Sequence, residues 1–283
     1  MIRILGVVVL YNPDNELENN IVSYLPYIDT LLVWKNSPLE DSLQNKLKLR
    51  DIDHKIVYMG DETNQGVGIA LNEAARFAVR EGYTHLLTMD QDSCFDSDMF
   101  PRYLDRISKY HRNDVMAFAV NTHRVDSFSE REVDIVMTSG TIHPIQAFEK
   151  IGYFLENLFI DAIDSEYCFR IRKLGYKIVR FDDIFMFHQL GRVTITPFLW
   201  GKLISPNYSA FRSYYLVRNH IIVKRMYGKD SCFVKGTFKN LFFWRPLAII
   251  FTESDKLAKL KSLVKGIIDG LTWNVKRISS NCN

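Results

Sequence analysis

The sequence predicts an α/β fold: a mostly parallel β-sheet flanked by helices, followed by a basic helical extension. Apolar runs rich in β-branched residues, typical of strands buried on both faces, alternate with helix-forming segments along residues 4–90. Such alternation is built from right-handed βαβ units, which place successive strands parallel in one sheet. The predicted strands are residues 4–10, 31–34, 55–59 and 85–89, and the predicted helices are residues 39–49 and 68–80.

The second half of the chain is less regular. Residues 164–174 predict a helix, because Gly175 stands where a left-handed residue closes a helix. Two short apolar runs, residues 177–181 and 185–187, predict separate strands, and residues 209–227 predict a further helix. No internal repeat or low-complexity linker divides the chain, so one large domain with an appendage is expected.

Charge divides the chain near residue 223. The net charge is +3, but residues 224–283 contain 12 Lys and Arg against 4 Asp and Glu, which leaves 24 against 29 for residues 1–223. The segments 232–251 and 256–278 interleave these basic residues with Leu, Ile, Phe and Trp. They predict either amphipathic helices on an anionic membrane surface or a helical cap packed on the domain. No nucleic-acid-binding module is recognisable, so nucleic acid is not an expected partner.

Composition and cysteine spacing indicate a cytoplasmic protein. The chain is 47% hydrophobic and 24% charged, which is ordinary for a globular protein. Its four cysteines show no C-x-x-C spacing, so neither a disulfide framework nor a zinc site is predicted. The amino-terminal residues show no signal-peptide cleavage site, and no apolar run reaches the roughly 18–20 residues of a membrane span.

Two acids follow the fourth predicted strand, in the segment LLTMDQDSCF (residues 86–95). Asp90 and Asp92 are expected at the carboxyl ends of the parallel strands, where such sheets bind ligands. Paired carboxylates suit Mg²⁺ or Mn²⁺, which prefers oxygen ligands and keeps positions open for phosphate. The alternative is a surface turn in which one acid caps a helix beginning near Ser97. Polar residues after the other strands share this rim: Tyr11, Asn12, Asn36 and Ser37.

A segment with two glycines, residues 60–78, includes the helix that precedes these acids. Gly66 and Gly68 introduce the helix, whose first N–H groups suit the polar groups of a nucleotide. The segment lacks both the P-loop and the dinucleotide-binding pattern. Glycines that serve only a turn and a tight helix–sheet contact are therefore an equal alternative.

Three acids near residues 164–174 are candidate catalytic groups. Asp164 stands where the helix begins, and is either an N-cap or a general base that takes a proton from an attacking hydroxyl. Asp161 is the rival base. Glu166 either orients an acceptor or pairs with Arg170.

Later residues add candidates for metal and phosphate binding. His188 follows an apolar run, and is either a hydrogen-bonded structural residue or a third metal ligand. Arg212, Arg218 and Asn219 lie on the predicted helix 209–227. Guanidinium groups bind phosphate bidentately, although surface arginines are the commoner case.

In order along residues 4–225, six blocks together resemble glycosyltransferase family 2. Within it they are most similar to the bacterial rhamnosyltransferases that build O-antigens and related polysaccharides. The blocks are VVVLYNP (7–13), NQGVGIALN (64–72), MDQDS (89–93), TSGTI (138–142), FIDAIDSEYCFRIRKLGYKI (159–178) and FHQLG (187–191). The resemblance implies a GT-A fold with a Rossmann-like nucleotide-binding half (residues 1–113) and an acceptor-binding half (residues 114–223). The basic segment that charge composition sets apart (residues 224–283) is expected to form an amphipathic helical tail.

The resemblance also implies a base and a metal site. Asp164 corresponds to the second acid of the family's Glu-Asp base motif, and Ile163 stands in place of the glutamate. Asp92 and His188 would hold Mg²⁺ or Mn²⁺, with Asp90 near the metal and the ribose of the donor.

Donor recognition is implied by a further set of residues. Arg218 and Asn219 match the family's Arg-Asn pair, which implies contact with the diphosphate. Many relatives read the nucleotide base with an aspartate where this chain has Lys35, which cannot accept an N–H hydrogen bond. Asn36, Asp61 or a backbone carbonyl is expected to replace it. The implied donor-binding residues are Tyr11, Asn12, Asn36, Asp61, Asn64, Gly66, Asn72, Asp90, Gln91, Arg212, Arg218 and Asn219.

The implied reaction is the inverting transfer of a sugar, expected to be L-rhamnose from dTDP-β-L-rhamnose, to a hydroxyl of a glycan or polyprenyl-diphosphate-linked acceptor. Other donors, carrying galactofuranose, glucose or galactose, are alternatives. Two further alternatives are a sugar-1-phosphate nucleotidyltransferase, whose glycine-rich basic loop is missing from YNPDNELENN, and a non-catalytic sugar-nucleotide-binding protein. A lipid-linked acceptor implies a peripheral position on the inner face of the plasma membrane, and a homodimer is left open.

Overall fold

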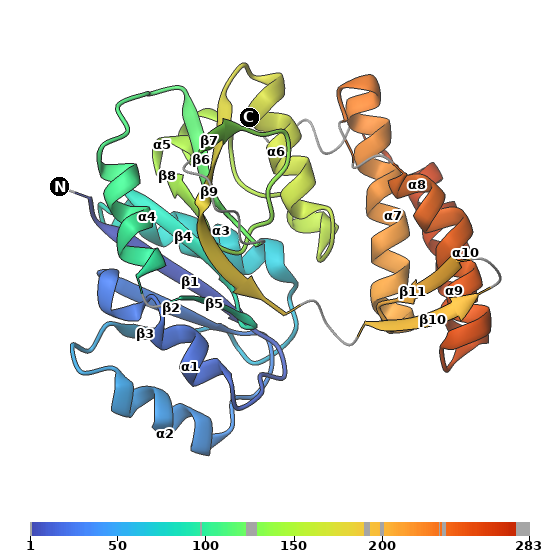
Figure 1. Ribbon diagram of the computed structural model, residues 1–283, viewed down its shortest axis with the longest axis horizontal. Helices are drawn as coiled ribbons and strands as arrows, with labels where there is room; N and C mark the ends of the chain where they lie inside the picture. Colours follow the sequence, from blue (N-terminus) through green and yellow to red (C-terminus); the bar gives the residue numbers. More distant parts are fainter. Residues whose placement is uncertain are drawn as a thin grey trace.

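The computed structural model describes residues 2–96, 98–122, 129–189, 193–198, 201–231, 233 and 236–275. The chain forms a sheet covered by helices and a smaller lobe beside it, coloured orange and red in Figure 1. The lobe contains a two-stranded hairpin and the last helices of the chain.

Four parallel strands form the amino-terminal half of the sheet, as the sequence predicted. They pair in the order β3-β2-β1-β4. Because the four strands are parallel, their carboxyl ends meet at one edge of the sheet. The strands are β1 (Ile4–Leu10), β2 (Thr30–Lys35), β3 (Ile56–Met59) and β4 (His85–Asp90).

Helices cover both faces of the sheet, which explains why β1 is apolar throughout. Leu5 and Val7 pack toward α3 and α6, whereas Val8 and Leu10 pack toward α1, α2 and α4. The buried alanines predicted on α3 allow this helix to approach the sheet closely. These helices are α1 (Leu17–Val22), α2 (Asp41–Arg50), α3 (Val67–Arg80), α4 (Met99–Ser108), α5 (Gln146–Lys150) and α6 (Ile163–Lys173).

The second half of the sheet is mixed rather than parallel. Strand β8 lies antiparallel between β4 and β6, and β6 pairs parallel with β9. Two short strands, β5 and β7, add antiparallel to β9. The expectation of a mostly parallel sheet therefore holds for the amino-terminal half. The strands are β5 (Ser93–Phe95), β6 (Val115–Asn121), β7 (Glu130–Glu132), β8 (Thr141–Pro144) and β9 (Lys177–His188).

The prediction of two separate strands at 177–181 and 185–187 is wrong, because β9 is one strand of 12 residues. Its register with β6 jumps from Val120↔Phe181 to Asn121↔Phe185, so the polar residues between the two apolar runs lie in a bulge. Inside the strand, Asp182 is 1% exposed and accepts hydrogen bonds from Arg131 and Arg180. Pairing with arginines on β7 and on β9 itself therefore allows this acid to lie within the strand.

The carboxy-terminal lobe begins with a hairpin that the sequence did not predict, β10 (Thr194–Phe198) and β11 (Gly201–Ser205). The helices that follow are α7 (Ala210–Tyr227), α8 (Thr237–Lys239), the π-helical turn η4 (Asn240–Trp244), α9 (Arg245–Thr252) and α10 (Lys256–Thr272). The expected boundary after residue 223 falls within α7, and the lobe as folded starts at β10. Among the described residues, no helix is both long and apolar enough to cross a bilayer.

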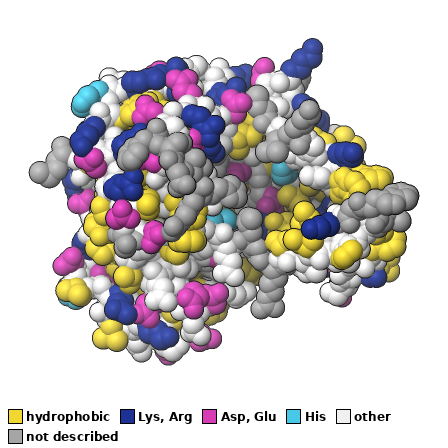
Figure 2. All heavy atoms as spheres, in the orientation of Figure 1, with side chains coloured by type: hydrophobic (Ala, Val, Ile, Leu, Met, Phe, Trp, Pro, Cys, Tyr) yellow, Lys and Arg dark blue, Asp and Glu magenta, His cyan; other side chains and the backbone are white. Residues whose placement is uncertain are grey.

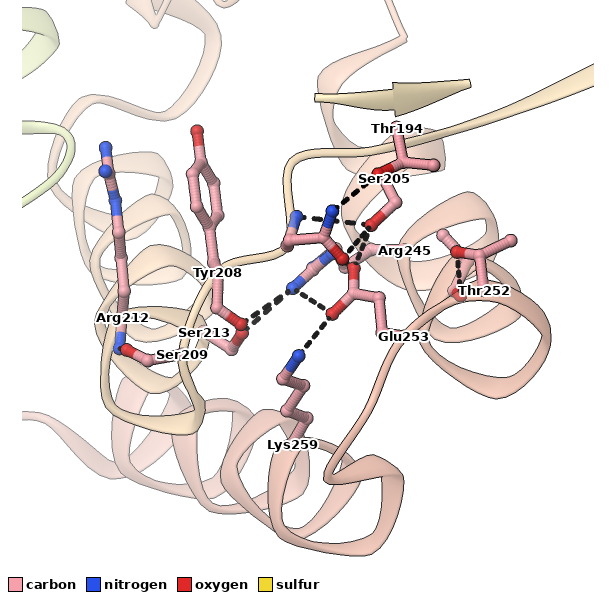
Figure 3. Close-up of polar contacts among 12 residues, drawn as sticks. Thr194, Ser205, Tyr208, Ser209, Arg212, Ser213, Arg245, Thr252, Glu253 and Lys259 are labelled. Atoms are coloured by element: carbon pink, nitrogen blue, oxygen red, sulfur yellow. Dashed lines mark hydrogen bonds and ion pairs between the residues drawn. The ribbon is translucent and has the colours of Figure 1, made fainter. Parts of the chain in front are cut away.

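A buried ionic network holds the lobe together. Glu253, which is 5% exposed, accepts hydrogen bonds from Arg245, Lys259 and Ser205, as Figure 3 shows. The Lys259 Nζ–Glu253 Oε2 distance is 2.8 Å. These four residues, named the lobe network below, join β11, α9 and α10 around one carboxylate.

Candidate active site

The carboxyl ends of β1 and β4 are tied together by Gln91, the residue between the two acids. Its Oε1 accepts a hydrogen bond from the Tyr11 N–H (2.8 Å), and its Nε2 donates to the Tyr11 carbonyl (3.1 Å). The side-chain amide thus continues the pairing of the two strands beyond their ends. Asn20 also donates to the Gln91 carbonyl at 2.8 Å. The turn that carries Asp90 and Asp92 is therefore fixed from two sides.

Asp90, Asp92 and His188 lie together, with one potential ligand atom from each within 4.8 Å of the others. This group is called the acid cluster below. The antiparallel pairing of β5 with the end of β9 places Ser93 opposite His188 and so brings the histidine to the acids. Asp92 Oδ1 is buried without a hydrogen-bond partner among the described residues, and lies 3.5 Å from His188 Nδ1.

The electrostatics of the acid cluster point to a missing positive charge. Burial, and then the neighbouring carboxylate of Asp92, raises the pKa of Asp90 to about 6. Burial also raises the pKa of Asp92. An unpaired buried carboxylate oxygen beside a second acid and an imidazole is a donor set that fits Mg²⁺ or Mn²⁺. The alternative that Asp90 or Asp92 caps the following helix is wrong, because α4 has Asp98 at its N-cap position, with no side-chain cap.

Two serines connect the members of the acid cluster. The Asp90 N–H donates to Ser139 Oγ (2.9 Å), Ser139 Oγ donates to Ser93 Oγ (2.8 Å), and Ser93 Oγ lies 2.8 Å from His188 Nδ1. This chain of hydrogen bonds fixes the orientation of the imidazole ring. The sequence reading did not assign roles to either serine. Both nevertheless fall within the blocks MDQDS and TSGTI, which were the available signal.

Asp164 lies in the first turn of α6, in the same charged region as Asp90. Its Oδ1 accepts a hydrogen bond from the Ser165 N–H at 2.7 Å. Burial raises the pKa of Asp164, the Ser165 N–H opposes that rise, and the Asp161 charge adds to it. The residue at the N-cap position is Ala162, so the N-cap reading of Asp164 is wrong. A carboxylate with a raised pKa is a stronger proton acceptor, as a general base requires.

The carboxylate of Asp161, the other candidate base, is paired with an arginine. Arg212 donates from Nη2 to Oδ1 (3.1 Å) and from Nε to Oδ2 (3.3 Å) of its carboxylate. The guanidinium lies 4.2 Å from the centre of the Tyr208 ring, and the two side chains extend side by side in Figure 3. Arg212 also lowers the pKa of Asp90 and Asp92 through its charge, so its guanidinium acts on the acid cluster.

The loop that carries Asp161 is strained, and α7 holds it. Phe159, Asp161 and Ala162 all have positive φ, between 62° and 66°. The Asn219 side-chain amide donates to the carbonyls of residues 158, 160 and 161, at 2.6 to 3.0 Å. Arg218 donates to the Asn157 carbonyl at 2.7 Å. Helix α7 of the lobe thus fixes the conformation of the loop that precedes α6.

Arg218 and Asn219 are therefore not brought to the acid cluster as diphosphate ligands. They are 5% and 0% exposed, and their polar atoms bind the loop and each other. The burial of this pair on α7 depends on tertiary packing, which sequence matching does not show. Its structural role, holding the loop around Asp161, replaces that expectation.

Two further candidates are buried structural residues. Glu166 is 0% exposed, its carboxylate pairs with Arg170 (2.7 Å), and it accepts a hydrogen bond from the Tyr227 hydroxyl (2.6 Å). The pairing alternative for Glu166 is the one observed. Asn72 is 1% exposed and binds the backbone N–H and carbonyl of Phe154. Neither side chain reaches the acid cluster.

Residues 61–66, before α3, form a turn that is held by hydrogen bonds among its own residues. Asp61 accepts hydrogen bonds from Thr63 and Gln65, and Asn64 accepts one from the Gly66 N–H. Gly66 has φ +86°, and a Cβ on it would lie 2.8 Å from Phe159, so only glycine fits there. The turn therefore packs directly on the loop that leads to Asp161.

The remaining rim residues differ in how accessible they are. The Asn36 side chain is buried, donates to the Gly66 carbonyl and accepts from Trp34 and Gln65. Tyr11 is 53% exposed at the end of β1. The Asn12 N–H is bound to Ser37 Oγ at 2.7 Å. Tyr11 and Asn12 are thus exposed on this rim, whereas Asn36 is buried.

Comparison with known proteins gives a consistent family and fold. The chain is 25% identical over a 292-residue alignment to the dTDP-rhamnosyl transferase RfbF of Shigella flexneri, covering 95% of each chain. Its structure is similar to the mannosyltransferase PcManGT of Pyrobaculum calidifontis, solved with GDP-Man and Mn²⁺ (TM-score 0.60, 13% identity, 99% of this chain and 79% of that chain). It is also similar to residues 1–349 of S. aureus TarS in complex with UDP-GlcNAc (TM-score 0.58, 14% identity, 98% and 84%).

These structural neighbours have the GT-A fold, which the mixed sheet and its flanking helices reproduce. The family described as "Glycosyl transferase family 2" matches residues 7–169. Because that match spans more than half of the chain and includes the turn of Asp90 and Asp92 and the first turn of α6, the protein belongs to glycosyltransferase family 2 and is rhamnosyltransferase-like.

Proposed function

We propose that the protein is a metal-dependent inverting glycosyltransferase in which Asp164 is the general base. The observation that carries this proposal is the convergence of the acid cluster, Arg212 and Asp164 from four separate parts of the chain. An acceptor hydroxyl is too weakly acidic to attack unaided, so a carboxylate must accept its proton as the new bond forms. The raised pKa of Asp164 suits that task.

Asp92 and His188, with Asp90 beside them, would hold Mg²⁺ or Mn²⁺. When bound, the metal offsets negative charge on the departing nucleoside diphosphate. Arg212 would also offset this negative charge, since its guanidinium already acts on Asp90 and Asp92. Among the chain's own groups, Asp161 holds that guanidinium in place and Ser93 orients the imidazole of His188.

A single in-line displacement by the acceptor oxygen inverts the anomeric centre. The bond from the sugar to the diphosphate oxygen breaks as the bond to the acceptor oxygen forms, and the acceptor proton passes to Asp164. A β-L-rhamnosyl donor would therefore give an α-L-rhamnoside.

Similarity to a dTDP-rhamnosyl transferase over the whole chain supports dTDP-β-L-rhamnose as the donor. Base recognition differs from the pattern expected of relatives. Lys35 forms an ion pair with Glu62 (2.6 Å), and the Asn36 side chain is already committed to the turn at 64–66. This leaves Asp61 and backbone groups to form hydrogen bonds with the nucleotide base of the donor. A glycan or a polyprenyl-diphosphate-linked sugar is the proposed acceptor.

A donor screen tests this function. The purified protein is incubated with Mn²⁺ or Mg²⁺ and a panel of nucleotide sugars, including those of rhamnose, galactofuranose, glucose and galactose, and released nucleoside diphosphate is measured. We expect release from dTDP-β-L-rhamnose above all others, and its loss with chelator. Preference for another sugar would reassign the donor. Binding of a nucleotide sugar without release from any, even with simple glycoside acceptors present, would contradict catalysis.

A further inference from the structure

Helix α10 packs on the lobe with one face and presents an apolar stripe on the other. Gly266 and Gly270 lie against α7, so close that a Cβ would meet the carbonyl oxygens of Tyr214 (2.6 Å) and Arg218 (2.9 Å). Lys259 and Leu263 are buried on the same side. The opposite side carries four aliphatic residues at helical spacing, each 55–67% exposed. They are Leu257, Val264, Ile268 and Leu271.

The charges on the exposed side of α10 are all positive. Lys256, Lys261 and Lys265 flank the apolar stripe and are exposed. The single acid within the helix, Asp269, is turned toward α7, where its carboxylate accepts a hydrogen bond from the Tyr214 hydroxyl (2.6 Å). A helix with an apolar stripe bordered by lysines has the form of a segment that lies in a membrane interface.

The hairpin repeats this arrangement. Ile195 and Ile204 are paired across β10 and β11 and are 58% and 62% exposed, so they share one outward face. Lys202 is exposed on the same face of β11, whereas the alternate residues Leu203 and Ser205 are buried in the lobe. The outward face of the hairpin is thus apolar and basic.

A third group lies on α9, which packs against α10 and β11, and on η4, which packs against α9. Phe243, Trp244 and Phe251 are 53%, 38% and 58% exposed. Lys239 lies 6.0 Å from the centre of the Trp244 ring. Figure 2 shows apolar side chains gathered over the lobe, interrupted by basic ones. Aromatic side chains beside lysines are typical of groups held at the level of lipid headgroups.

We infer that the exposed residues of these three elements form a docking surface for an anionic lipid membrane, named the outer face of the lobe. Its apolar side chains would enter the headgroup region, and its lysines would meet anionic headgroups. A second copy of the chain fits less well, because a two-fold contact would bring lysines of both copies together. The inference does not rest on the proposed reaction, since lipid binding requires neither donor nor acceptor.

Vesicle co-sedimentation of the full chain tests the inference. We expect binding to vesicles with about 30% phosphatidylglycerol, little binding to pure phosphatidylcholine, and weakening as salt rises. The double variant Val264→Glu/Ile268→Glu should lower the bound fraction about tenfold. The matched control is Leu49→Glu/Ile52→Glu, which places the same charges at residues 80% and 84% exposed on and beside α2, and it should bind as the wild type does.

Thermal unfolding verifies that the variants are folded. If Val264→Glu/Ile268→Glu unfolds, Leu257→Glu/Ile204→Glu on α10 and the hairpin makes the same test. Three results would overturn the inference: wild-type protein that stays in the supernatant, unaltered binding by both outer-face variants, or equal binding to neutral vesicles. Sedimentation velocity gives a fourth, a wild-type dimer that the outer-face variants convert to monomer, which would assign the surface to a second copy.

Discussion

The acid cluster at the strand ends and the lobe network differ in how their charges are compensated. In the acid cluster, two carboxylates and an imidazole converge, and one buried carboxylate oxygen has no partner among the described residues. In the lobe network, one carboxylate accepts hydrogen bonds from two cations and a hydroxyl. Burial favours neutral acids in both places. Only in the lobe network do hydrogen-bonding partners outweigh this effect of burial.

The pKa directions of the acids record this difference. Burial and the neighbouring acid raise the pKa of Asp90 to about 6. The pKa of Glu253 is lowered instead, because hydrogen bonds from Lys259, Ser205 and Arg245 outweigh the effect of burial. A network with balanced charges needs no further partner, whereas an incomplete one at the strand ends indicates a ligand that brings the missing charge. Mutations should therefore affect stability in the lobe and activity at the strand ends.

The largest effect is expected from Asp164→Asn. Removing the proton acceptor should lower kcat by about 10²- to 10⁴-fold, since that is the usual contribution of general-base catalysis. Donor affinity measured by calorimetry should stay within about twofold. In the wild type, activity should rise with pH through a pKa above the ordinary aspartate value of 3.8, because the pKa of Asp164 is raised and the base must be ionised. Equal loss of donor binding and turnover would make Asp164 structural.

Glu253→Gln should destabilise the protein by about 3–5 kcal/mol, because Arg245 and Lys259 would stay buried without a full countercharge. Urea unfolding measures this, and the exposed Asp255→Asn is the control, expected within about 0.5 kcal/mol. A lowered folded pKa means that the stabilisation by Glu253 is present above the ordinary value of 4.5 and is lost as pH falls through the folded pKa. A stable variant with reduced kcat would reverse the roles of the two clusters.

Asp92→Asn should act in the opposite sense to Glu253→Gln. Losing a proposed metal ligand should weaken Mn²⁺-dependent donor binding by about 100-fold or more. Without metal, the free energy of unfolding of the variant should exceed that of the wild type by about 1 kcal/mol, because one of two neighbouring negative charges is gone. Calorimetry with and without chelator, together with urea unfolding, measures both effects. Donor binding that chelator leaves unchanged in the wild type would contradict the metal site.

Ser139→Ala should produce the smallest effect. It breaks the hydrogen-bond chain from Asp90 to His188 without removing a ligand, so metal affinity should fall about 10- to 100-fold. Ser165→Ala is the matched control, since its N–H, rather than its hydroxyl, makes the short bond to Asp164. Mn²⁺ titration followed by donor binding compares them. Identical affinities would show that the imidazole needs no such support.

Much of the fold could be predicted because it depends on local pattern. The apolar run of β1, the alanines of α3 and Gly175 after α6 each identify an element without reference to the rest of the chain. The hairpin β10–β11 could not be found this way. Its outward face carries Ile195 and Ile204 beside Lys202, so the apolar–polar alternation that identifies a strand with one wet face is missing.

The site was predictable where residues follow strand ends, and not where burial decides their role. Asp90 and Asp92 follow β4, and the resemblance added His188, 96 positions after Asp92. In the sequence, a polar residue such as Asn219 looks the same whether its side chain contacts a ligand or a loop. Only the packed structure shows that its amide is already satisfied by backbone carbonyls.

Because Asn219 on α7 binds the loop before α6, the lobe cannot be removed without affecting that loop. A chain shortened before β10 would lose the donor to three carbonyls and the support of a loop with left-handed residues. A change to the lobe is therefore expected to alter the loop that carries Asp161 together with the proposed docking surface.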